Sequence, residues 1–419
     1  MKNTTDIRTA RRTAWNIPVY TGDVSGVCSA LYELGGMVVM HDPSGCNSTY
    51  NTHDEIRWMD QESLIFISGL RESDAIAGDD RRLIDEVCEA ACEFQPAFIA
   101  IASSPIPWLT GTDFHSVTKK IQERCRIPCF YVPTNAMHDY TAGAGRAFEE
   151  LAKWMFRKSS GTHQAAYAAG EDRQVLKNGV NILGLTPLDF TVRSDVFILK
   201  EELEAQGFRV VSSWAMGDNL DSLRRSKEAA VNLVVSSAGM KAARWMESEL
   251  GIPYVAGIPV GAFAEVLYQA LTQAARTGES AVPYLPHLAD SFASGDSGCN
   301  GFAGECVTMG SRAAALAIET GKACALIPLT EETAGLAPQG ILRPQGEAQI
   351  REALSGYAKV YADPMLECAC REGCDFHPLP HFALSGRMYL DQMQPFYARY
   401  GNSVPLQRRR QGTGGDIQQ

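Results

Sequence analysis

The sequence contains no apolar run that approaches the ~20 residues a helix needs to cross a bilayer, which argues against a membrane protein. Its first residues, MKNTTDIRTARRTAWNIP, are partly basic, but no apolar stretch follows them, so we expect no secretory signal. An excess of basic charge is also lacking, since the formal net charge is -11. This charge argues against a nucleic-acid partner, which would need a basic face. We therefore expect a cytoplasmic protein with neither a membrane nor a nucleic-acid partner.

Cysteine, by contrast, is abundant, with 12 residues in a chain of 419. In a long chain without a signal, these are expected to be reduced thiols available to metals, and not a disulfide framework. A chain of this length exceeds a single hydrophobic core, and the usual size of a domain predicts roughly two to four domains.

Three segments repeat one pattern, in which an apolar, β-branched run is followed by a turn and an amphipathic helix. They lie at residues 98–132, 180–255 and 304–330. Strands that alternate with helices of 10 to 15 residues are typical of parallel sheets built from βαβ units. The sequence therefore predicts an α/β protein with three Rossmann-like, doubly wound domains and mainly parallel sheets.

Two stretches rich in Gly, Ser and Ala, at 157–174 and 293–304, are the expected domain boundaries. The end of the chain is poor in apolar residues and is expected to be a disordered tail. The predicted domains and tail cover residues 1–175, 176–296, 297–405 and 406–419.

The apolar run Met37 to Met40 leads directly into a Pro-Ser-Gly turn and Cys46. Ligands of doubly wound sheets bind at the carboxyl ends of strands, which is where Cys46 falls. An isolated thiol is more often a small core residue. However, seven polar residues lie within ten positions, and such polarity is costly unless it meets solvent, metal or substrate. These residues are His41, Asp42, Asn47, Thr49, His53, Asp54 and Glu55. We predict a functional site here.

Three stretches resemble, in this order, the motifs of the nitrogenase component 1 family: HDPSGCNSTY (41–50), SLIFISGLRESDAIAGDDRRLIDEV (63–87) and IASSPIPWLTGTDF (101–114). In that family a strand ends in His-Gly-x-x-Gly-Cys. A segment close to Glu-x-Asp-Ala-Val-Phe-Gly-Gly and a Cys-x-x-x-x-Ile-Gly-Asp-Asp loop follow. VNILG (180–184) and AAVNLVVS (229–236) also fit, so the resemblance covers nearly the whole chain.

The resemblance implies a nitrogenase-like oxidoreductase component that carries an iron–sulfur cluster, of the [4Fe-4S] type, at a subunit interface. It would accept electrons from an ATP-dependent reductase of the iron-protein type and reduce a small molecule or a tetrapyrrole. The alternative role is a non-catalytic scaffold on which a metallocluster is assembled. The implied partners are this reductase and a second subunit, in a homodimer or in a heterotetramer with a paralogue. ATP would bind only to the reductase, because GAGRAFEEL (143–151) lacks the Lys-Ser/Thr of a P-loop.

Subunits of the family typically hold the bridging cluster through three thiolates, and Cys46 matches the middle one. The other two positions hold Thr21 and Ser104 in this chain. Cys28, two helical turns or ~10 Å beyond Thr21, is a candidate ligand. A two-fold dimer would then supply four thiolates, two each from Cys28 and Cys46. Alternatively, Cys28 packs in the core, and Ser104, Asp42 or cysteines of a partner subunit complete the site.

His41 is expected to act beside the cluster by hydrogen bonding to its sulfurs, and Ser104 is expected to contact the cofactor. In the family, a histidine near the end of the third domain faces the cavity between the domains. PHFALSG (380–386) resembles that region, so His381 and Arg387 are catalytic candidates, together with His53 near Cys46. The anchoring cysteine of the large nitrogenase metallocofactor has no counterpart around YVAGIPVGAFAE (254–265), which argues against dinitrogen reduction.

Two further groups of cysteines remain. Cys368, Cys370 and Cys374 have a C-x-C-x3-C spacing that matches neither a zinc ribbon nor a ferredoxin, so they are either incidental thiols or a metal site. Cys88 and Cys92 stand four apart in a predicted helix, and we expect them to pack in the core and not to bind metal.

Overall fold

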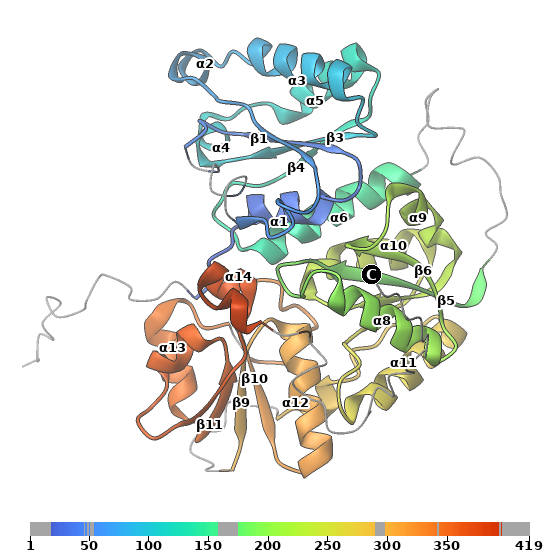
Figure 1. Ribbon diagram of the computed structural model, residues 1–419, viewed down its shortest axis with the longest axis vertical. Coiled ribbons are helices and arrows are strands. Elements are labelled where there is room, and N and C mark those ends of the chain that lie inside the picture. The colour runs from blue at the N-terminus through green and yellow to red at the C-terminus, as the bar shows by residue number, and fades with distance from the viewer. Residues whose placement is uncertain are drawn as a thin grey trace, which may run out of the picture.

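The computed structural model describes residues 18–45, 47, 50, 54–157, 175–289, 298–341, 343–393 and 395. Within this part the chain forms three separate four-stranded sheets, one after another along the sequence. Figure 1 shows them as three lobes, the first (blue) above the second (green and yellow) and the third (orange and red). Every strand pairing is parallel. The predicted fold class is therefore confirmed.

The predicted domain limits stay a prediction, although each sheet falls inside one of the expected segments. The predicted tail, 406–419, lies outside the described residues. None of the helices in the described ranges combines the length and the apolar character that crossing a membrane requires.

The first sheet has the order β2-β1-β3-β4. Its strands are β1 (Met37–His41), β2 (Leu64–Ile67), β3 (Ile99–Ser103) and β4 (Cys129–Val132). The helices around it are α1 (Asp23–Leu31), α2 (Glu72–Ala77), α3 (Arg81–Phe94), α4 (Pro105–Thr110), α5 (Phe114–Cys125) and α6 (Tyr140–Phe156).

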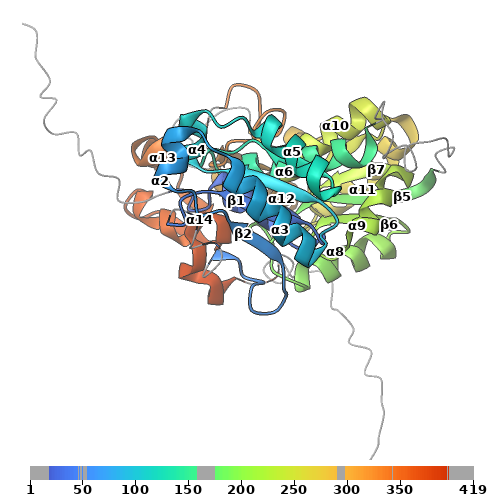
Figure 2. The same ribbon diagram turned by 90° about the horizontal axis from the view of Figure 1, so that it is seen from above.

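Helices cover both faces of this sheet, which explains why its central strands read as unbroken apolar runs. Successive side chains of a strand point to opposite faces. Met37 and Val39 of β1 pack against α3 and α5, and Val38 and Met40 join the core formed with α1 and α6. Figures 1 and 2 show α3 and α5 on the outer side of the sheet. A parallel sheet buried on both faces is the arrangement that such runs predict.

The second sheet has the order β6-β5-β7-β8. Its strands are β5 (Leu176–Leu185), β6 (Arg209–Ala215), β7 (Ala229–Val234) and β8 (Tyr254–Ala256). Its helices are α8 (Ser194–Ala205), α9 (Leu220–Arg224), α10 (Met240–Leu250) and α11 (Phe263–Thr277), with the 3-10 helices η3 (Arg225–Glu228), η4 (Ser237–Gly239) and η5 (Leu285–His287).

The third sheet has the order β10-β9-β11-β12. Its strands are β9 (Asn300–Gly304), β10 (Cys324–Pro328), β11 (Lys359–Ala362) and β12 (Asp375–Pro378). Its helices are α12 (Cys306–Thr320), α13 (Gly346–Ser355) and α14 (Phe382–Ser385), with the 3-10 helices η6 (Pro364–Ala369) and η7 (Gly386–Gln392).

All three sheets share one topology, in which the first strand is central and the chain moves first to one side of it and then to the other. In such sheets the loops after the first and third strands diverge, and the crevice between them is the usual binding place. In the first domain these loops follow β1 and β3, so they carry Cys46 and Ser104. The fold therefore brings the two predicted ligand positions to one switch point.

Helices α1 and α6 approach each other through glycine. A Cβ atom placed on Gly143 of α6 would lie 1.9 Å from the Asp23 carbonyl oxygen, and one on Gly26 of α1 would lie 2.4 Å from the Tyr140 carbonyl oxygen. Both obstacles are backbone atoms, which cannot move aside as a flexible side chain does. Only glycine fits at this contact.

Replacing Gly143 with alanine is therefore expected to lower the free energy of unfolding by about 3 kcal/mol, the upper part of the range for overpacking. Chemical denaturation would measure the change. Gly298→Ala is a matched control, because nothing lies within 4 Å of a Cβ at that position. Equal stability of the two variants would contradict the close approach of α1 and α6.

Candidate functional site

The strand end before Cys46 is fixed by His41. The His41 side chain is buried, its Nδ1 lies 2.8 Å from the Ser68 hydroxyl, and its ring meets that of Phe114 edge-on at 6.0 Å. Burial lowers the pKa of His41 to about 4, so the ring is neutral at pH 7. Cys46 and His53 lie outside the described residues, whereas Gly45 and Asn47 on either side of Cys46 are described.

Three buried polar atoms without a hydrogen-bond partner in the described structure belong to residues that follow β1 and β3 in the chain. They are Asp42 Oδ1, Asn47 Nδ2 and Ser104 Oγ. The chain holds them together, because the Ser104 amide donates to the His41 carbonyl (3.2 Å) and the Asn47 amide donates to Asp42 Oδ2 (3.2 Å). An unsatisfied buried polar group costs about 1–3 kcal/mol, so a bound group is the expected reason for three of them.

These residues fit a metal–sulfur group in part. Cys46 offers one thiolate, and Asp42 and Ser104 offer oxygen atoms. In the described part of the chain, no set of three or more His, Cys, Asp and Glu side chains is placed to hold a metal ion.

The thiol of Cys28 is not accessible at the surface of the described structure. It is fully buried on α1 within the apolar core, and burial, followed by the nearby Glu55 carboxylate, raises the pKa of its thiol. Thr21, at the other family position, is also buried. The burial of Cys28 favours the interpretation that it packs in the core.

A buried ion pair holds the segment after Cys46. Arg57 donates to both Glu55 oxygens (2.7 and 3.0 Å) and to Glu33 (2.9 Å), and both Arg57 and Glu55 are 1% exposed. The hydroxyls of Ser29 and Tyr50 also donate to Glu55, each at 2.9 Å. Burial alone would raise the pKa of Glu55, but the charge of Arg57 outweighs it and the pKa lies below its usual value.

This ion pair was not predicted. Glu55 was noted only as one of several polar residues, and Arg57 follows it in a stretch, EIRWMD, that has no burial pattern. Glu33 also accepts a hydrogen bond from the Gly217 amide (3.0 Å), so the network joins the first domain to the second.

A second polar cluster lies where the three domains meet, and Asp189 is at its centre. One Asp189 oxygen accepts from the Tyr140 hydroxyl (2.5 Å) and lies 3.1 Å from His381 Nε2. The other accepts from the hydroxyls of Thr186 (3.1 Å) and Ser236 (2.7 Å). Asp189 therefore binds side chains of the first, second and third domains at once.

Two more buried carboxylates complete a ring of contacts between domains. Asp139 at the start of α6 accepts from the Glu331 amide (2.6 Å), and Glu305 at the start of α12 accepts from the Ser237 amide (2.9 Å). Burial, reinforced for Glu305 by the charge of Asp189, raises the pKa of both groups. Each domain thus contributes a buried carboxylate that binds a neighbouring domain.

The catalytic candidates of the third domain are placed differently from each other. His381 is buried in the cluster at the junction, and its Nδ1 has no partner among the described residues. Two hydroxyls at the same junction, Ser237 Oγ and Thr330 Oγ1, are also without one. Arg387, in contrast, is exposed on η7. The structure therefore brings His381 into the cluster and leaves Arg387 at the surface.

Removing the Tyr140 hydroxyl tests the central contact. Tyr140→Phe is expected to lower the free energy of unfolding by about 1.5–3 kcal/mol, because the hydrogen bond ends on a buried carboxylate. Tyr20→Phe is the control, since the Tyr20 hydroxyl meets Asp54 at an exposed position (3.1 Å), and it should cost less than about 0.5 kcal/mol. Urea denaturation measures the free energy of unfolding. An equal decrease in the two variants would contradict the conclusion that Asp189 stabilises the junction of the three domains.

The cysteines near the end of the third domain do not form a metal centre in the described structure. Cys368 is exposed, while Cys370 and Cys374 are partly buried against the core of that domain. Burial, followed by the nearby Cys374, raises the pKa of Cys370 to about 12, so its thiol stays protonated at neutral pH. His377 stacks on Tyr361 with its ring centre 4.5 Å away. These contacts favour packing over metal binding.

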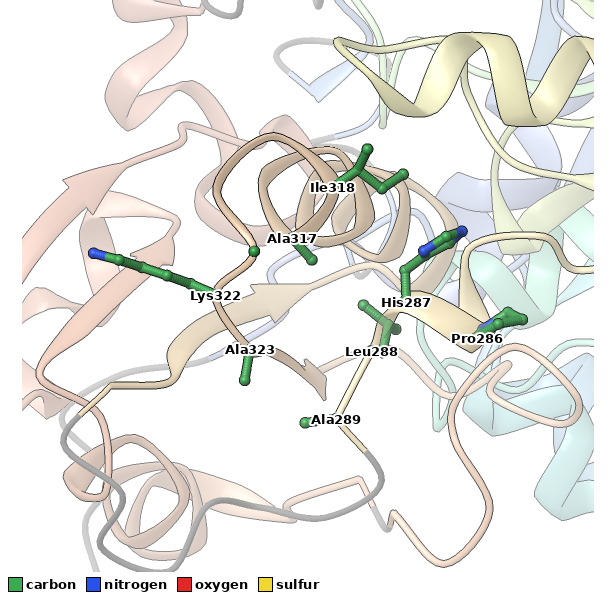
Figure 3. Close-up of a pocket in the computed structure, with 9 residues that line it drawn as sticks. Pro286, His287, Leu288, Ala289, Ala317, Ile318, Lys322 and Ala323 are labelled. Carbon is green, nitrogen blue, oxygen red and sulfur yellow. The ribbon is translucent and has the colours of Figure 1, made fainter.

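A surface groove lies between η5 and the end of α12 (Figure 3). Its polar side chains, His287 and Lys322, point to different sides, and most of the other lining residues are alanine or other apolar residues. A binding site usually has polar groups that converge on one point. The groove is therefore a weaker candidate than the two polar clusters.

The sequence model of the family described as nitrogenase component 1 type oxidoreductases matches residues 25–280. The chain is 25% identical over 220 residues to the nitrogenase iron-molybdenum cofactor biosynthesis protein NifE of Methanosarcina barkeri, covering 52% of this chain and 46% of that protein. It is 27% identical over 227 residues to a subunit of the light-independent protochlorophyllide reductase of Prosthecochloris aestuarii, covering 53% and 39%. The chain spans about half the length of the curated relatives it matches.

Among solved structures, the chain resembles the one described as nitrogenase Cp1 at pH 5. The TM-score is 0.56 with 15% sequence identity, over 94% of this chain and 92% of that one. At this identity the likeness concerns the fold alone. The family match, which extends over more than half of the chain, agrees with the three-sheet architecture and with the motif around Cys46. The chain therefore belongs to the nitrogenase component 1 family of oxidoreductases.

Proposed function

We propose that this protein is the electron-accepting component of a nitrogenase-like reductase and that it holds an iron–sulfur cluster at the carboxyl ends of β1 and β3. The single observation that carries the proposal is the set of three unsatisfied buried polar atoms, on Asp42, Asn47 and Ser104, which follow β1 and β3 in the chain. Electrons would come from an ATP-dependent reductase of the iron-protein type, in the cytoplasm. The substrate would be a small molecule or a tetrapyrrole.

In this proposal each residue of the first domain has a role. Cys46 supplies a thiolate, and Asp42 and Ser104 supply oxygen ligands. The side-chain amide of Asn47 donates a hydrogen bond to the cluster. His41 stays neutral and orients the strand end through Ser68 and Phe114. When bound, the cluster supplies one-electron redox chemistry.

A second subunit is part of the proposal. A cubane cluster is usually held by four thiolates, and Cys46 is the one thiolate that this proposal assigns to the site in each chain. A second copy of the chain or a paralogous subunit would complete the site across an interface.

The second candidate function is a scaffold on which a metallocluster is assembled. Two observations favour it. The relatives include NifE proteins, whose name refers to cofactor biosynthesis. In addition, the Tyr140 hydroxyl donates to Asp189 and His381 Nε2 lies 3.1 Å from the same carboxylate, so direct contacts tie the three domains together at their junction.

Anaerobic purification followed by iron and acid-labile sulfide analysis tests the proposal. We expect both elements in similar amounts and an electron paramagnetic resonance signal after reduction. Incubation of the cluster-containing protein with the reduced reductase and MgATP then distinguishes the reductase function from the scaffold function. A reductase component should accept electrons repeatedly and keep its cluster, whereas a scaffold should pass its iron and sulfide to a metal-free acceptor protein. Full-length protein without iron, even after reconstitution with iron and sulfide, would refute both.

A further inference from the structure

A pair of thiols lies on the outer side of the first domain, between two helices that are far apart in sequence. The Cys125 thiol, at the end of α5, lies 2.8 Å from the sulfur of Cys88 on α3, in a geometry that fits donation to it. Both are partly buried, and both pack against the core under these helices. The sequence predicted a core position for Cys88 together with Cys92, but Cys92 is exposed. The true neighbour of Cys88 is Cys125, from a different helix.

The environment of the pair distinguishes the two sulfurs. Burial, followed by the hydrogen bond to Cys88, raises the pKa of Cys125 to about 12, so Cys125 is the protonated member. Cys88 accepts that hydrogen bond. Arg124, which is paired with Asp85 (2.5 Å), also interacts electrostatically with both sulfurs. A nearby cation favours a thiolate, and the thiolate is the form that oxidants attack.

The distance is close to that needed for a covalent bond. A disulfide has a sulfur–sulfur length of about 2.05 Å, so these sulfurs need to approach by less than ~1 Å. Helices α3 and α5 lie side by side on the sheet in both views (Figures 1 and 2).

We propose that Cys88 and Cys125 form a dithiol site that hydrogen peroxide converts to a disulfide. In the first step the Cys88 thiolate attacks one peroxide oxygen, the O–O bond breaks, and the products are a sulfenic acid on Cys88 and hydroxide. In the second step the Cys125 sulfur attacks the Cys88 sulfur, hydroxide leaves, and the disulfide forms. The proton of Cys125 neutralises one hydroxide, and the proton that Cys88 released on forming its thiolate neutralises the other. In total, two thiols and one peroxide give one disulfide and two waters.

The site is independent of the proposed cluster. It lies on the face of the first sheet that α3 and α5 cover, and its oxidation consumes neither Cys46 nor Cys28. The bond would tie the two helices together by linking two cysteines that are 37 positions apart in the sequence. A cross-link of this kind restricts the unfolded chain and raises the melting temperature.

The test uses the full-length protein, reduced and then exposed to one equivalent of hydrogen peroxide. Remaining thiols are alkylated, and the protein is cleaved after both glutamate and arginine without reduction. Glu89 lies between Cys88 and Cys92, and Arg126 lies between Cys125 and Cys129, so every cysteine of this region falls on its own fragment. We expect one linked pair of fragments, Val87–Glu89 with Cys125–Arg126, and the loss of two thiols per chain.

Variants provide the controls. Cys88→Ser and Cys125→Ser should abolish the link, whereas Cys92→Ser, on the same helix, should leave it unchanged. The mapping in the unmodified protein decides the question even if a variant does not fold. A link from Cys88 to Cys92, a link from Cys125 to Cys129, or oxidation confined to Cys92 would overturn the proposal. So would zinc that copurifies with the protein and protects both thiols from peroxide.

Discussion

Cys46→Ala is expected to remove most of the iron from the anaerobically purified protein and to leave the stability of the metal-free protein nearly unchanged. The reason is that the proposed function makes Cys46 a ligand: in the chain it directly follows the turn Pro43-Ser44-Gly45 after β1, and Asp42 and Ser104 carry buried oxygen atoms without a partner among the described residues. A residue in that position contributes a ligand and little packing. A core cysteine would behave in the opposite way, since its loss should cost on the order of 1 kcal/mol or more and leave the iron in place.

Cys28→Ala is the matched control, because Cys28 is fully buried in α1. We expect this variant to unfold more easily, by on the order of 1 kcal/mol, and to retain its iron. The iron content is measured on both purified variants, and the melting curve is measured on their metal-free forms. Cys46→Ala should lose iron and keep its stability, whereas Cys28→Ala should keep iron and lose stability. Iron retained by Cys46→Ala would refute its role as a ligand. Iron lost from Cys28→Ala without loss of stability would instead support Cys28 as the second thiolate.

Replacing Arg57 with methionine is expected to lower the free energy of unfolding by about 3–5 kcal/mol, the range for breaking a buried ion pair. The variant leaves the Glu55 carboxylate buried without its cation, and it also removes the contact to Glu33. Methionine keeps much of the apolar volume of the arginine stem, so the loss reports mainly the uncompensated charge. Urea denaturation of the metal-free protein measures the effect.

Arg81→Met is the control for this variant. Arg81 pairs with Asp79 at 2.6 Å, but its side chain is 86% exposed. Solvent screens such a pair, so its loss should change the free energy of unfolding far less than Arg57→Met does. Glu55→Gln in the Arg57→Met background should recover part of the stability, because the buried negative charge is then removed as well. No recovery in this double variant would mean that lost packing, and not charge, explains the effect of Arg57→Met.

The sequence determined the fold class, since β1, β3 and the other central strands are apolar on both faces and alternate with helices of regular length. It also singled out the stretch around Cys46 as a candidate site, because the end of an apolar strand and a Pro-Ser-Gly turn are local features; the role of Cys46 stays a prediction. These signals are read from residues next to one another in the chain. The position of a residue along a helix or strand sets the face of that element to which its side chain points.

Only the tertiary structure decided which residues meet across the chain. Asp189 binds Tyr140 and His381, which are 49 and 192 residues away. Cys88 meets Cys125 and not Cys92, although Cys92 is one helical turn away. Periodicity places a residue on the buried or exposed side of its own element, but it carries no information about the element that packs against that side. The partner of a buried charge or thiol is set by how helices and sheets dock, and that docking depends on contacts summed over the whole domain.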